Sequence, residues 1–115
     1  MANAAYDKSF EYAVEIVRLA KELMSQKKYE LANQLIRSGT SVGANISESE
    51  YAQSRQDFVA KLSIALKEAS ESRYWLRLLG ATGDIAEEDA KRLIERSDDI
   101  IRISTASIKT AKEKI

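Results

Sequence analysis

The chain has 115 residues, and its 18 Lys and Arg residues balance 18 Asp and Glu residues. It therefore lacks the basic excess typical of proteins that bind nucleic acid through phosphate groups. It has no cysteine, which excludes disulfide-stabilised secreted folds, and no proline, which removes the strongest helix breaker. We expect a cytoplasmic, all-α protein with one domain over residues 1–115 and no membrane-spanning segment.

The first helix is predicted to begin after Ser9, a residue type that caps helix N-termini, and to end between residues 25 and 27. Its apolar residues recur at helical spacing in two adjacent stripes. The first stripe is Phe10, Ala13, Val14, Val17, Ala20 and Met24, and the second is Tyr12, Ile16, Leu19 and Leu23. Together they form a wider apolar face than one core contact needs, and the third helix shows the same surplus. Such surplus predicts self-association.

The second helix is predicted over residues 29–53 and includes a run of small residues around Gly39 and Gly43. Each glycine costs about 1 kcal/mol relative to alanine inside a helix, which favours a loop. A continuous helix, however, places Leu35, Val42 and Ile46 on one side and sets the glycines one turn apart. We favour the continuous helix, with small residues where a helix of the same chain, a second copy or a ligand packs closely.

The third helix is predicted to begin after Ser54, which forms a capping-box pattern with Asp57, and to end at Gly80 or Gly83. It continues the helical apolar period of the chain and carries Trp75 on one flank. Tyr74-Trp75 is either a base-stacking platform or, with the leucines that follow, a packing element.

Asp84 is predicted to cap the fourth helix. Acidic residues four positions before basic ones are expected to pair on its solvated face, and these pairs are Glu87 with Lys91, Glu88 with Arg92 and Asp98 with Arg102. Short connections imply antiparallel neighbours. The predicted fold is an antiparallel up-down-up-down four-helix bundle.

The run of small residues also matches a catalytic motif, because Gly39-Thr-Ser41-Val-Gly43 fits the G-x-S-x-G nucleophile elbow. That motif needs a strand before the serine and a histidine to activate it, and the chain has no histidine. A metal site would need carboxylates alone, with Glu48, Glu68 and Glu71 as candidates, although such residues are ordinarily solvated or paired with Arg or Lys. We expect no enzyme activity, no metal and no cofactor.

Six residues are our candidates for a helix-packing or oligomer interface, namely Ser38, Gly39, Val42, Gly43, Asn45 and Glu48. Asn45 and Glu48 lie three positions apart and share a helix face. Two interpretations of this pair stay open: both are exposed, or both hydrogen-bond across a helix interface and fix its register.

Three segments carry a family resemblance: residues 9–14 (Ser-Phe-Glu-Tyr-Ala-Val), residues 35–48, and residues 58–79 with Ala65-Leu-Lys-Glu-Ala69 and Tyr74-Trp-Leu76. Through them the chain resembles the bacterial four-helix bundle proteins whose first members are encoded in intervening sequences of large-subunit ribosomal RNA genes. Many of those relatives have proline where Gly43 stands and Ala-Glu-Gly where this chain has Ser47-Glu48-Ser49.

The resemblance implies a ring-shaped homopentamer without enzymatic activity. The family also includes accessory proteins of reverse transcriptases in diversity-generating retroelements, in which a strongly basic ring binds nucleic acid and the polymerase. We therefore expect a non-enzymatic, homo-oligomeric bundle, a pentamer, that acts as an assembly or adaptor module. The alternative is an RNA- or DNA-binding accessory protein with a basic patch on the ring, for which Lys27, Lys28 and Arg37 are the candidate contacts.

Overall fold

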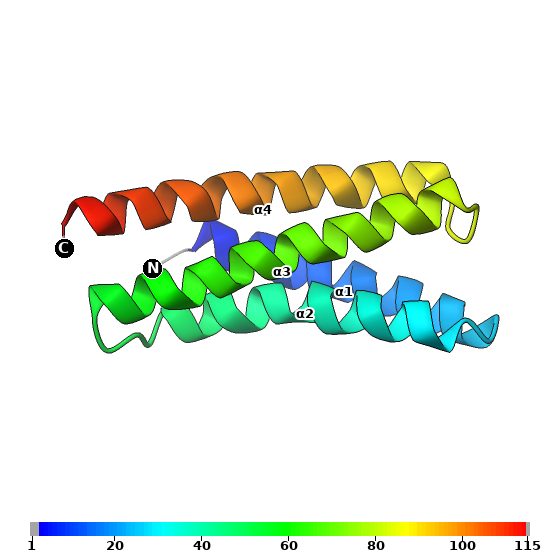
Figure 1. Cartoon of the computed structure of the whole chain (residues 1–115), viewed down its shortest axis with the longest axis horizontal. Helices are drawn as coiled ribbons and strands as arrows, with labels where there is room; N and C mark the ends of the chain where they lie inside the picture. The colour runs from blue at the N-terminus through cyan, green and yellow to red at the C-terminus, as the bar shows by residue number, and fades with distance from the viewer. Residues whose placement is uncertain (1–2, 115) are drawn as a thin grey trace.

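Four antiparallel helices form the structure, a computed structural model that describes residues 3–114. They are α1 (Ala4–Ser25), α2 (Tyr29–Ser49), α3 (Arg55–Ala81) and α4 (Glu87–Glu113), and the described residues contain no β-strand. α1 and α3 each contact α2 and α4, so the helices follow one another around the bundle (Figure 1). The start of α1 and the end of α4 lie toward the same end of this rod, which measures 47 × 21 × 20 Å. The predicted all-α four-helix bundle is confirmed.

The core is the inward stripe of each helix. Tyr12, Ile16 and Leu23 of α1 are fully buried, whereas the adjacent stripe of the same helix stays partly open and includes Phe10, 58% exposed. Burial of each large apolar side chain contributes about 1.5–3 kcal/mol, which makes this core the main source of stability. The first helix therefore buries one of its two apolar stripes within the bundle, and the other stripe, apart from the buried Ala20, stays exposed or half-buried.

α1 begins earlier than predicted. Asn3 is the N-cap, and its Oδ1 accepts a hydrogen bond from the backbone N of Tyr6 at 3.0 Å. The prediction that Ser9 caps the helix is wrong, because Ser9 is fully buried inside α1 and its Oγ donates to the carbonyl of Tyr6 at 2.8 Å. A serine within a helix commonly satisfies its hydroxyl in this way.

α2 runs without interruption through Gly39 and Gly43, so the helical interpretation is confirmed and the loop interpretation is wrong. It ends at Ser49 rather than at residue 53. The reason lies in the next helix, since Ser54 must be extended (φ −159°, ψ 169°) to act as the N-cap of α3. The chain therefore leaves α2 several residues earlier than the pattern suggested.

The capping pattern at the start of α3 is confirmed. The backbone N of Asp57 donates to Ser54 Oγ at 3.0 Å, and Asp57 Oδ2 accepts from the backbone N of Gln53 at 3.1 Å. α3 ends at Ala81, close to the predicted glycines, and Gly83 then adopts a left-handed conformation with φ 77° that glycine tolerates without steric cost.

Asp84 does not cap α4, so that prediction is wrong. The N-cap is Ala86, which makes no side-chain capping bond. Asp84 instead accepts hydrogen bonds from Lys28, in the turn between α1 and α2, and from Thr82. These bonds hold the pKa of Asp84 below its usual value. Asp84 thereby ties two turns together at one end of the bundle.

The ion pairs predicted along α4 are also replaced by others. Arg92 pairs with Asp89 and with Glu15 of α1, and Arg102 pairs with Asp99. Both alternatives within α4 are three positions apart, a spacing at which side chains also meet on a helix. Asp98 pairs with Arg73 of α3, because a neighbouring helix offers a partner that the sequence of α4 alone does not show.

Candidate oligomer interface

The two glycines of α2 mark its closest approach to α1 of the same chain. A Cβ atom added at Gly39 would lie 2.6 Å from Cγ2 of Ile16, and one at Gly43 would lie 3.2 Å from Oγ of Ser9. Real Cβ atoms do not approach another heavy atom to 2.6 Å. The small residues therefore let α1 and α2 pack closely inside one protomer, and they are not themselves the surface that a second copy would meet.

Within the predicted set of six, three residues lie inside the bundle. Ser38, Gly39 and Val42 are buried, and Ser38 Oγ donates to the carbonyl of Gln34 at 2.8 Å within α2. Gly43 is half-buried at the contact with α1.

The remaining two residues of the set turn away from the α1 contact. Asn45 is half-buried, and its Nδ2 donates to the carbonyl of Ser41 at 2.9 Å in its own helix. Glu48 is exposed and lies 3.3 Å from Lys61 Nζ of α3. Of the two, Glu48 alone reaches another helix, through a surface ion pair.

A surface almost without charge covers the outside of the α1–α2 contact. Its residues recur at spacings of three and four along each helix, so they share one side, and all are exposed or half-buried. We call this surface the α1–α2 face, and it consists of Phe10, Ala13, Val14, Val17, Lys21 and Met24 on α1 and Tyr29, Asn33, Ile36, Thr40, Ala44 and Ser47 on α2.

Lys21 is the single charged residue of this face, although 31% of the chain is charged. Phe10 and Tyr29 are its large exposed side chains, at 58% and 56%. The ring of Phe10 stacks on that of Tyr6, with 6.4 Å between the ring centroids. The face thus combines aromatic anchors on its two helices with small residues between them.

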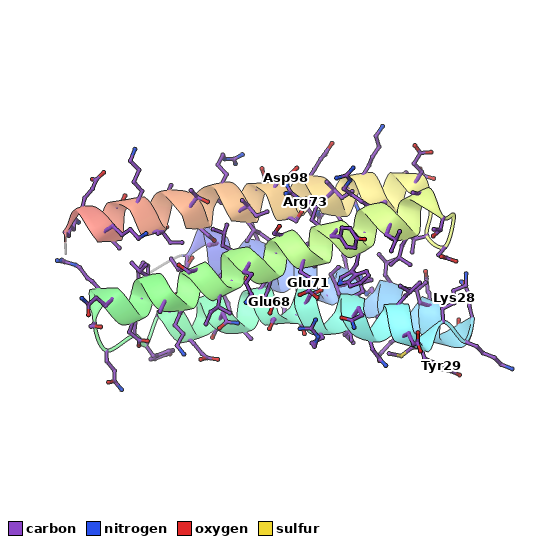
Figure 2. The ribbon with its side chains drawn as sticks, viewed as in Figure 1. Lys28, Tyr29, Glu68, Glu71, Arg73 and Asp98 are labelled. Atoms are coloured by element: carbon purple, nitrogen blue, oxygen red, sulfur yellow. The ribbon has the colours of Figure 1, made fainter. Side chains whose placement is uncertain are left out.

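The other three contacts between neighbouring helices carry ion pairs on their outer side. Arg92 and Arg96 of α4 pair with Glu15 of α1. Arg73 of α3 pairs with Asp98 of α4, and Figure 2 labels both residues of this pair. The α2–α3 contact has ion pairs of its own, described below. In residues 3–114, no ion pair joins α1 to α2.

Arg37 organises the charges between α2 and α3. Its guanidinium donates to Glu71 Oε2 at 2.6 Å and lies 4.0 Å from Glu68 Oε2, an oxygen that is buried without a hydrogen-bond donor. Figure 2 labels the two glutamates on α3. Glu71 also accepts from the indole N–H of Trp75 at 3.1 Å. The residues named as possible metal ligands, Glu48 among them, therefore lie beside cations, and the described part of the chain holds no group of three or more potential ligands.

The three cations proposed as nucleic-acid contacts are not gathered in one patch. Lys28 donates to Asp84 and Arg37 to Glu71. Lys27 is exposed in the turn between α1 and α2, where it adopts a left-handed backbone with φ 65°. Arg37 lies more than two helical turns further along α2, roughly 13 Å along the axis.

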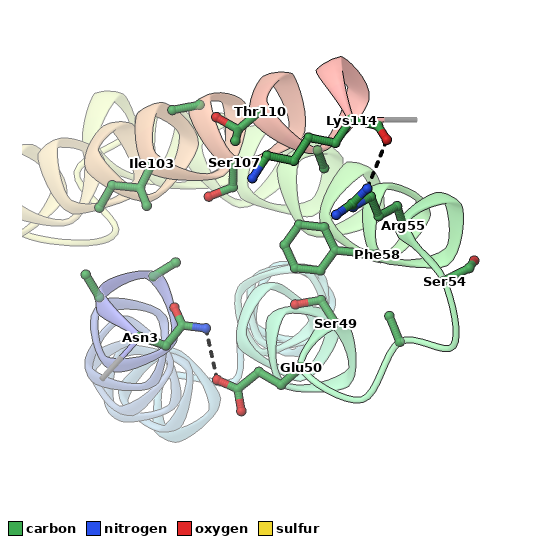
Figure 3. A pocket seen from close by; sticks show the side chains of 15 residues that line it. Asn3, Ser49, Glu50, Ser54, Arg55, Phe58, Ile103, Ser107, Thr110 and Lys114 are labelled. Atoms are coloured by element: carbon green, nitrogen blue, oxygen red, sulfur yellow. Dashed lines mark hydrogen bonds between the residues drawn. The ribbon is translucent and has the colours of Figure 1, made fainter. Parts of the chain in front are cut away.

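α1 and α4 separate at the end of the bundle where the chain begins and ends, which leaves a groove of about 980 Å³. The ring of Phe58 points into it, and hydrogen bonds from Asn3 to Glu50 and from Arg55 to the carbonyl of Lys114 border it (Figure 3). Its walls are alanines, Ile103 and small hydroxyl side chains of α4. The α1–α4 contact is the least extensive of the four.

The side chain of Tyr12 crosses the core of the bundle. Its hydroxyl lies 2.7 Å from Ser72 Oγ of α3, the helix diagonally opposite α1. Ser72 Oγ also lies 3.0 Å from the carbonyl oxygen of Ala69, and either hydroxyl can donate in the Tyr12–Ser72 pair. Burial raises the pKa of the Tyr12 hydroxyl to about 12, while the hydrogen bonds to Ser72 and Ser97 act in the opposite direction.

Sequence reasoning found the surplus apolar stripe of α1 but missed the matching stripe of α2. That stripe was readable in the sequence, because residues 29, 33, 36, 40, 44 and 47 follow helical spacing and none is charged. Several members of this stripe are small or polar, so the spacing of large apolar residues does not reveal it. These members are Asn33, Thr40, Ala44 and Ser47. The absence of charge was the more informative signal.

Comparisons with known proteins agree with this architecture. Residues 1–106 match the family model of the 23S rRNA-intervening sequence protein. A solved structure of a protein of unknown function from the S23 ribosomal protein family of Bacteroides thetaiotaomicron is 48% identical, with a TM-score of 0.90 over 92% of this chain and 99% of that one. A comparison with curated proteins gave no significant match. No helix in residues 3–114 is long and apolar enough to span a membrane. The chain belongs to the 23S rRNA-intervening sequence protein family.

Proposed function

We propose that the protein is a non-enzymatic assembly or adaptor module that works as a homo-oligomer, with the α1–α2 face covered by a second copy. The observation that carries the proposal is the near absence of charge on that face. Protein interfaces are distinguished from other surface mainly by the depletion of charged residues at their centre and by enrichment in aromatic residues. Both features occur on the α1–α2 face, which has Lys21 as its one charge and Phe10 and Tyr29 as exposed aromatics.

The apolar content of the face supports the same proposal. Phe10, Val14, Val17 and Met24 of α1 all retain accessible surface although they follow the helical period of a buried stripe. An exposed contiguous apolar patch lowers solubility unless something covers it. A second copy is always present at the concentration of the protein itself, which makes it the simplest partner.

For the assembly we propose a pentamer in the cytoplasm. The number of copies comes from the family resemblance, and the compartment from the lack of cysteine, which suits a reducing environment. The pentamer would have a mass five times that of one 12.9 kDa chain.

Binding of RNA or DNA stays an alternative prediction with less support. Lys28 and Arg37 would have to exchange Asp84 and Glu71 for phosphate groups, and the chain has no net positive charge. A titration of a generic RNA at increasing salt measures this directly. Submicromolar binding that weakens steeply with salt would favour the alternative, because that dependence follows from counterion release.

The proposal is tested by the mass of the protein and of one variant in solution. Size-exclusion chromatography with light scattering should give the unmodified protein a mass several times 12.9 kDa. Phe10→Glu places a carboxylate on the α1–α2 face and should reduce the mass to that of one chain. Ser63→Glu is the matched control, because Ser63 is exposed on α3 away from this face, and it should leave the mass unchanged.

An unmodified protein that elutes as a single chain at all concentrations would sink the proposal. So would a Phe10→Glu variant that keeps the mass of its parent. Circular dichroism of each variant confirms that the helices remain, since Phe10 is 58% exposed and its replacement removes little of the core.

A further inference from the structure

The groove between α1 and α4 is long and has small side chains on its walls. Along α4 it extends from Ile103 to Lys114, roughly 16 Å of helix axis. Phe58 and Ile103 are the large apolar residues that line it, and the other apolar ones are alanines, namely Ala4, Ala5, Ala52, Ala106 and Ala111. Its volume of about 980 Å³ is within the range of small-molecule sites, about 300–1,000 Å³. The space suits a long, narrow apolar molecule.

Two cations at the rim of this groove have no acidic partner. Arg55 and Lys114 line the groove, and neither forms an ion pair within residues 3–114. Arg55 Nη1 donates to the backbone carbonyl oxygen of Lys114 at 2.9 Å, which leaves the charge of the guanidinium without a counter-ion. Glu50 is the one acidic residue of the lining, and it accepts from Asn3 on the other side of the rim (Figure 3). The lining therefore has an excess of one positive charge.

The charged residues next to the lining do not cancel this excess. Within four positions of a lining residue, the described chain has five further cations and five further anions. The cations are Lys8, Lys61, Arg102, Lys109 and Lys112, and the anions are Asp7, Glu48, Asp57, Asp99 and Glu113. Two of these anions already pair with two of these cations, since Glu48 binds Lys61 and Asp99 binds Arg102. The groove is therefore complementary to a ligand with a negative charge.

We propose that the groove binds the anion of an unbranched fatty acid. The carboxylate lies against Arg55 and Lys114, and the alkyl chain runs along α4 to the ring of Phe58 and to Ile103. A guanidinium matches a carboxylate because both are planar and form paired hydrogen bonds. An alkyl chain is slim enough to lie between alanines, and burial of each methylene group strengthens its binding. This inference does not depend on self-association, because no residue of the groove belongs to the α1–α2 face.

The walls of the groove favour an alkyl chain over a helix from a partner protein. A docked helix packs its apolar side against a groove with walls on both sides, over several turns. Here α4 supplies about three turns of wall, whereas α1 supplies only residues 3–5, which is less than one turn. A flexible chain can follow α4 alone, so the unequal walls do not limit it.

The length of the ligand tests the apolar part of the site. Isothermal titration calorimetry of the full chain with octanoate, decanoate and dodecanoate, each below its micelle-forming concentration, should show saturable one-to-one binding. Each buried methylene should tighten binding about four-fold, so the affinity should rise about 15-fold for every two carbons added. Absence of saturable dodecanoate binding would overturn the proposal and would leave a partner helix as the remaining occupant.

The charge of Arg55 tests the position of the carboxylate. Arg55→Gln should weaken decanoate binding at least about ten-fold and should leave the binding of the neutral 1-decanol unchanged. Lys109→Gln is the matched control, because Lys109 is an exposed cation of α4 outside the lining, and it should change neither affinity by more than about two-fold. Equal losses for decanoate in the two variants would overturn the assignment of the carboxylate to Arg55.

Filling the groove separates this site from the α1–α2 face, which is also apolar. Ser107→Phe places a ring in the groove and should abolish binding of both ligands, whereas Thr105→Phe, at an exposed position of α4 outside the lining, should not. If Ser107→Phe loses its helical signal in circular dichroism, Ala106→Phe replaces it, because Ala106 is an exposed lining residue. Unchanged binding in the filled variant would overturn the proposal. So would a filled variant of altered mass in solution, because a second copy would then occupy the groove.

Discussion

α1 packs against its two neighbours in opposite ways. Against α2 it uses small residues, with Gly39 and Gly43 opposite Ile16 and Ser9, and no ion pair joins the two helices in the described residues. Against α4 it uses charge, because Glu15 pairs with two arginines, and beyond that point the helices separate into a groove.

The two kinds of contact leave different side chains on the surface above them. Ion pairs place charged groups at the rim, where water solvates them and where each contributes little to stability. Close packing through glycine needs no such rim, and the surface over the α1–α2 contact is free to remain apolar. The tightest internal contact of α1 therefore lies beneath the surface that we assign to a second copy.

Replacing Gly39 should disrupt the α1–α2 contact and lower the stability of the protein more than any of the changes below. Gly39→Leu forces its Cβ to 2.6 Å from Ile16 Cγ2 and 3.2 Å from Ile16 Cβ, so the whole side chain of Ile16 must move. Overpacking of this kind costs about 3 kcal/mol. Chemical denaturation at fixed protein concentration, followed by far-ultraviolet circular dichroism, measures the loss. A variant as stable as the parent would contradict the packing described at Gly39.

Alkaline pH should weaken the attachment of α1 to the far side of the core. The pKa of Tyr12 is raised from 10 to about 12 in the folded protein, so the folded state disfavours the phenolate. This contribution is complete below pH 10 and is lost as the pH rises from 10 to 12, by up to about 3 kcal/mol. Tyr12→Phe removes the titrating group.

The control for this prediction is the slope of stability against pH. The parent should lose more stability than Tyr12→Phe between pH 10 and 12, because all other titrating groups are common to the two proteins. Identical slopes would show that Tyr12 does not ionise on unfolding in this range.

Removing the charge of Glu15 should weaken the α1–α4 contact, with a loss of stability much smaller than that caused by Gly39→Leu or by ionisation of Tyr12. Glu15→Gln abolishes the ion pairs with Arg92 and Arg96, whose side chains are 44% and 42% exposed. Exposed ion pairs contribute about 0.2–1 kcal/mol each, and salt screens them. The loss should shrink as salt is added to the denaturation experiment. A loss that does not depend on salt would indicate packing rather than charge at Glu15.

Gly43→Ala should have the smallest effect of the series. Its Cβ would lie 3.2 Å from Ser9 Oγ and 3.5 Å from the carbonyl oxygen of Ser9, so a small shift of the hydroxyl accommodates it. Alanine also gains about 1 kcal/mol of helix propensity over glycine. We expect a net change within about 1 kcal/mol. A loss comparable to that of Gly39→Leu would mean that both glycines are equally constrained.

The helical period was enough to predict the four helices and the continuity of α2, because both depend on which residues share a side. Helix ends were less predictable where a residue type has two roles. Ser9 and Ser54 look alike in sequence, yet Ser54 caps α3 while Ser9 is a small buried residue opposite Gly43. Asp84 likewise resembles a cap, but Lys28, distant in sequence, binds it.

The interface candidates show the same limit. The small residues of α2 correctly indicated a close approach, but the sequence did not tell whether α1 of the same chain or a second copy makes it. Only the arrangement of the helices places Ile16 beside Gly39 and moves the candidate interface one stripe outward, to residues such as Ala44. Charge pairing across helices, as between Arg37 and Glu71, was equally invisible before the neighbours were known.

The most direct test asks whether the α1–α2 face is covered in solution. The chain has no cysteine, so Ala44→Cys introduces a unique thiol on that face, and Ser70→Cys introduces one at an exposed position of α3 outside it. We predict that a maleimide labels Ala44→Cys much more slowly than Ser70→Cys, and that adding Phe10→Glu to the first variant removes the difference. Equal labelling rates in the two single variants would contradict a covered face.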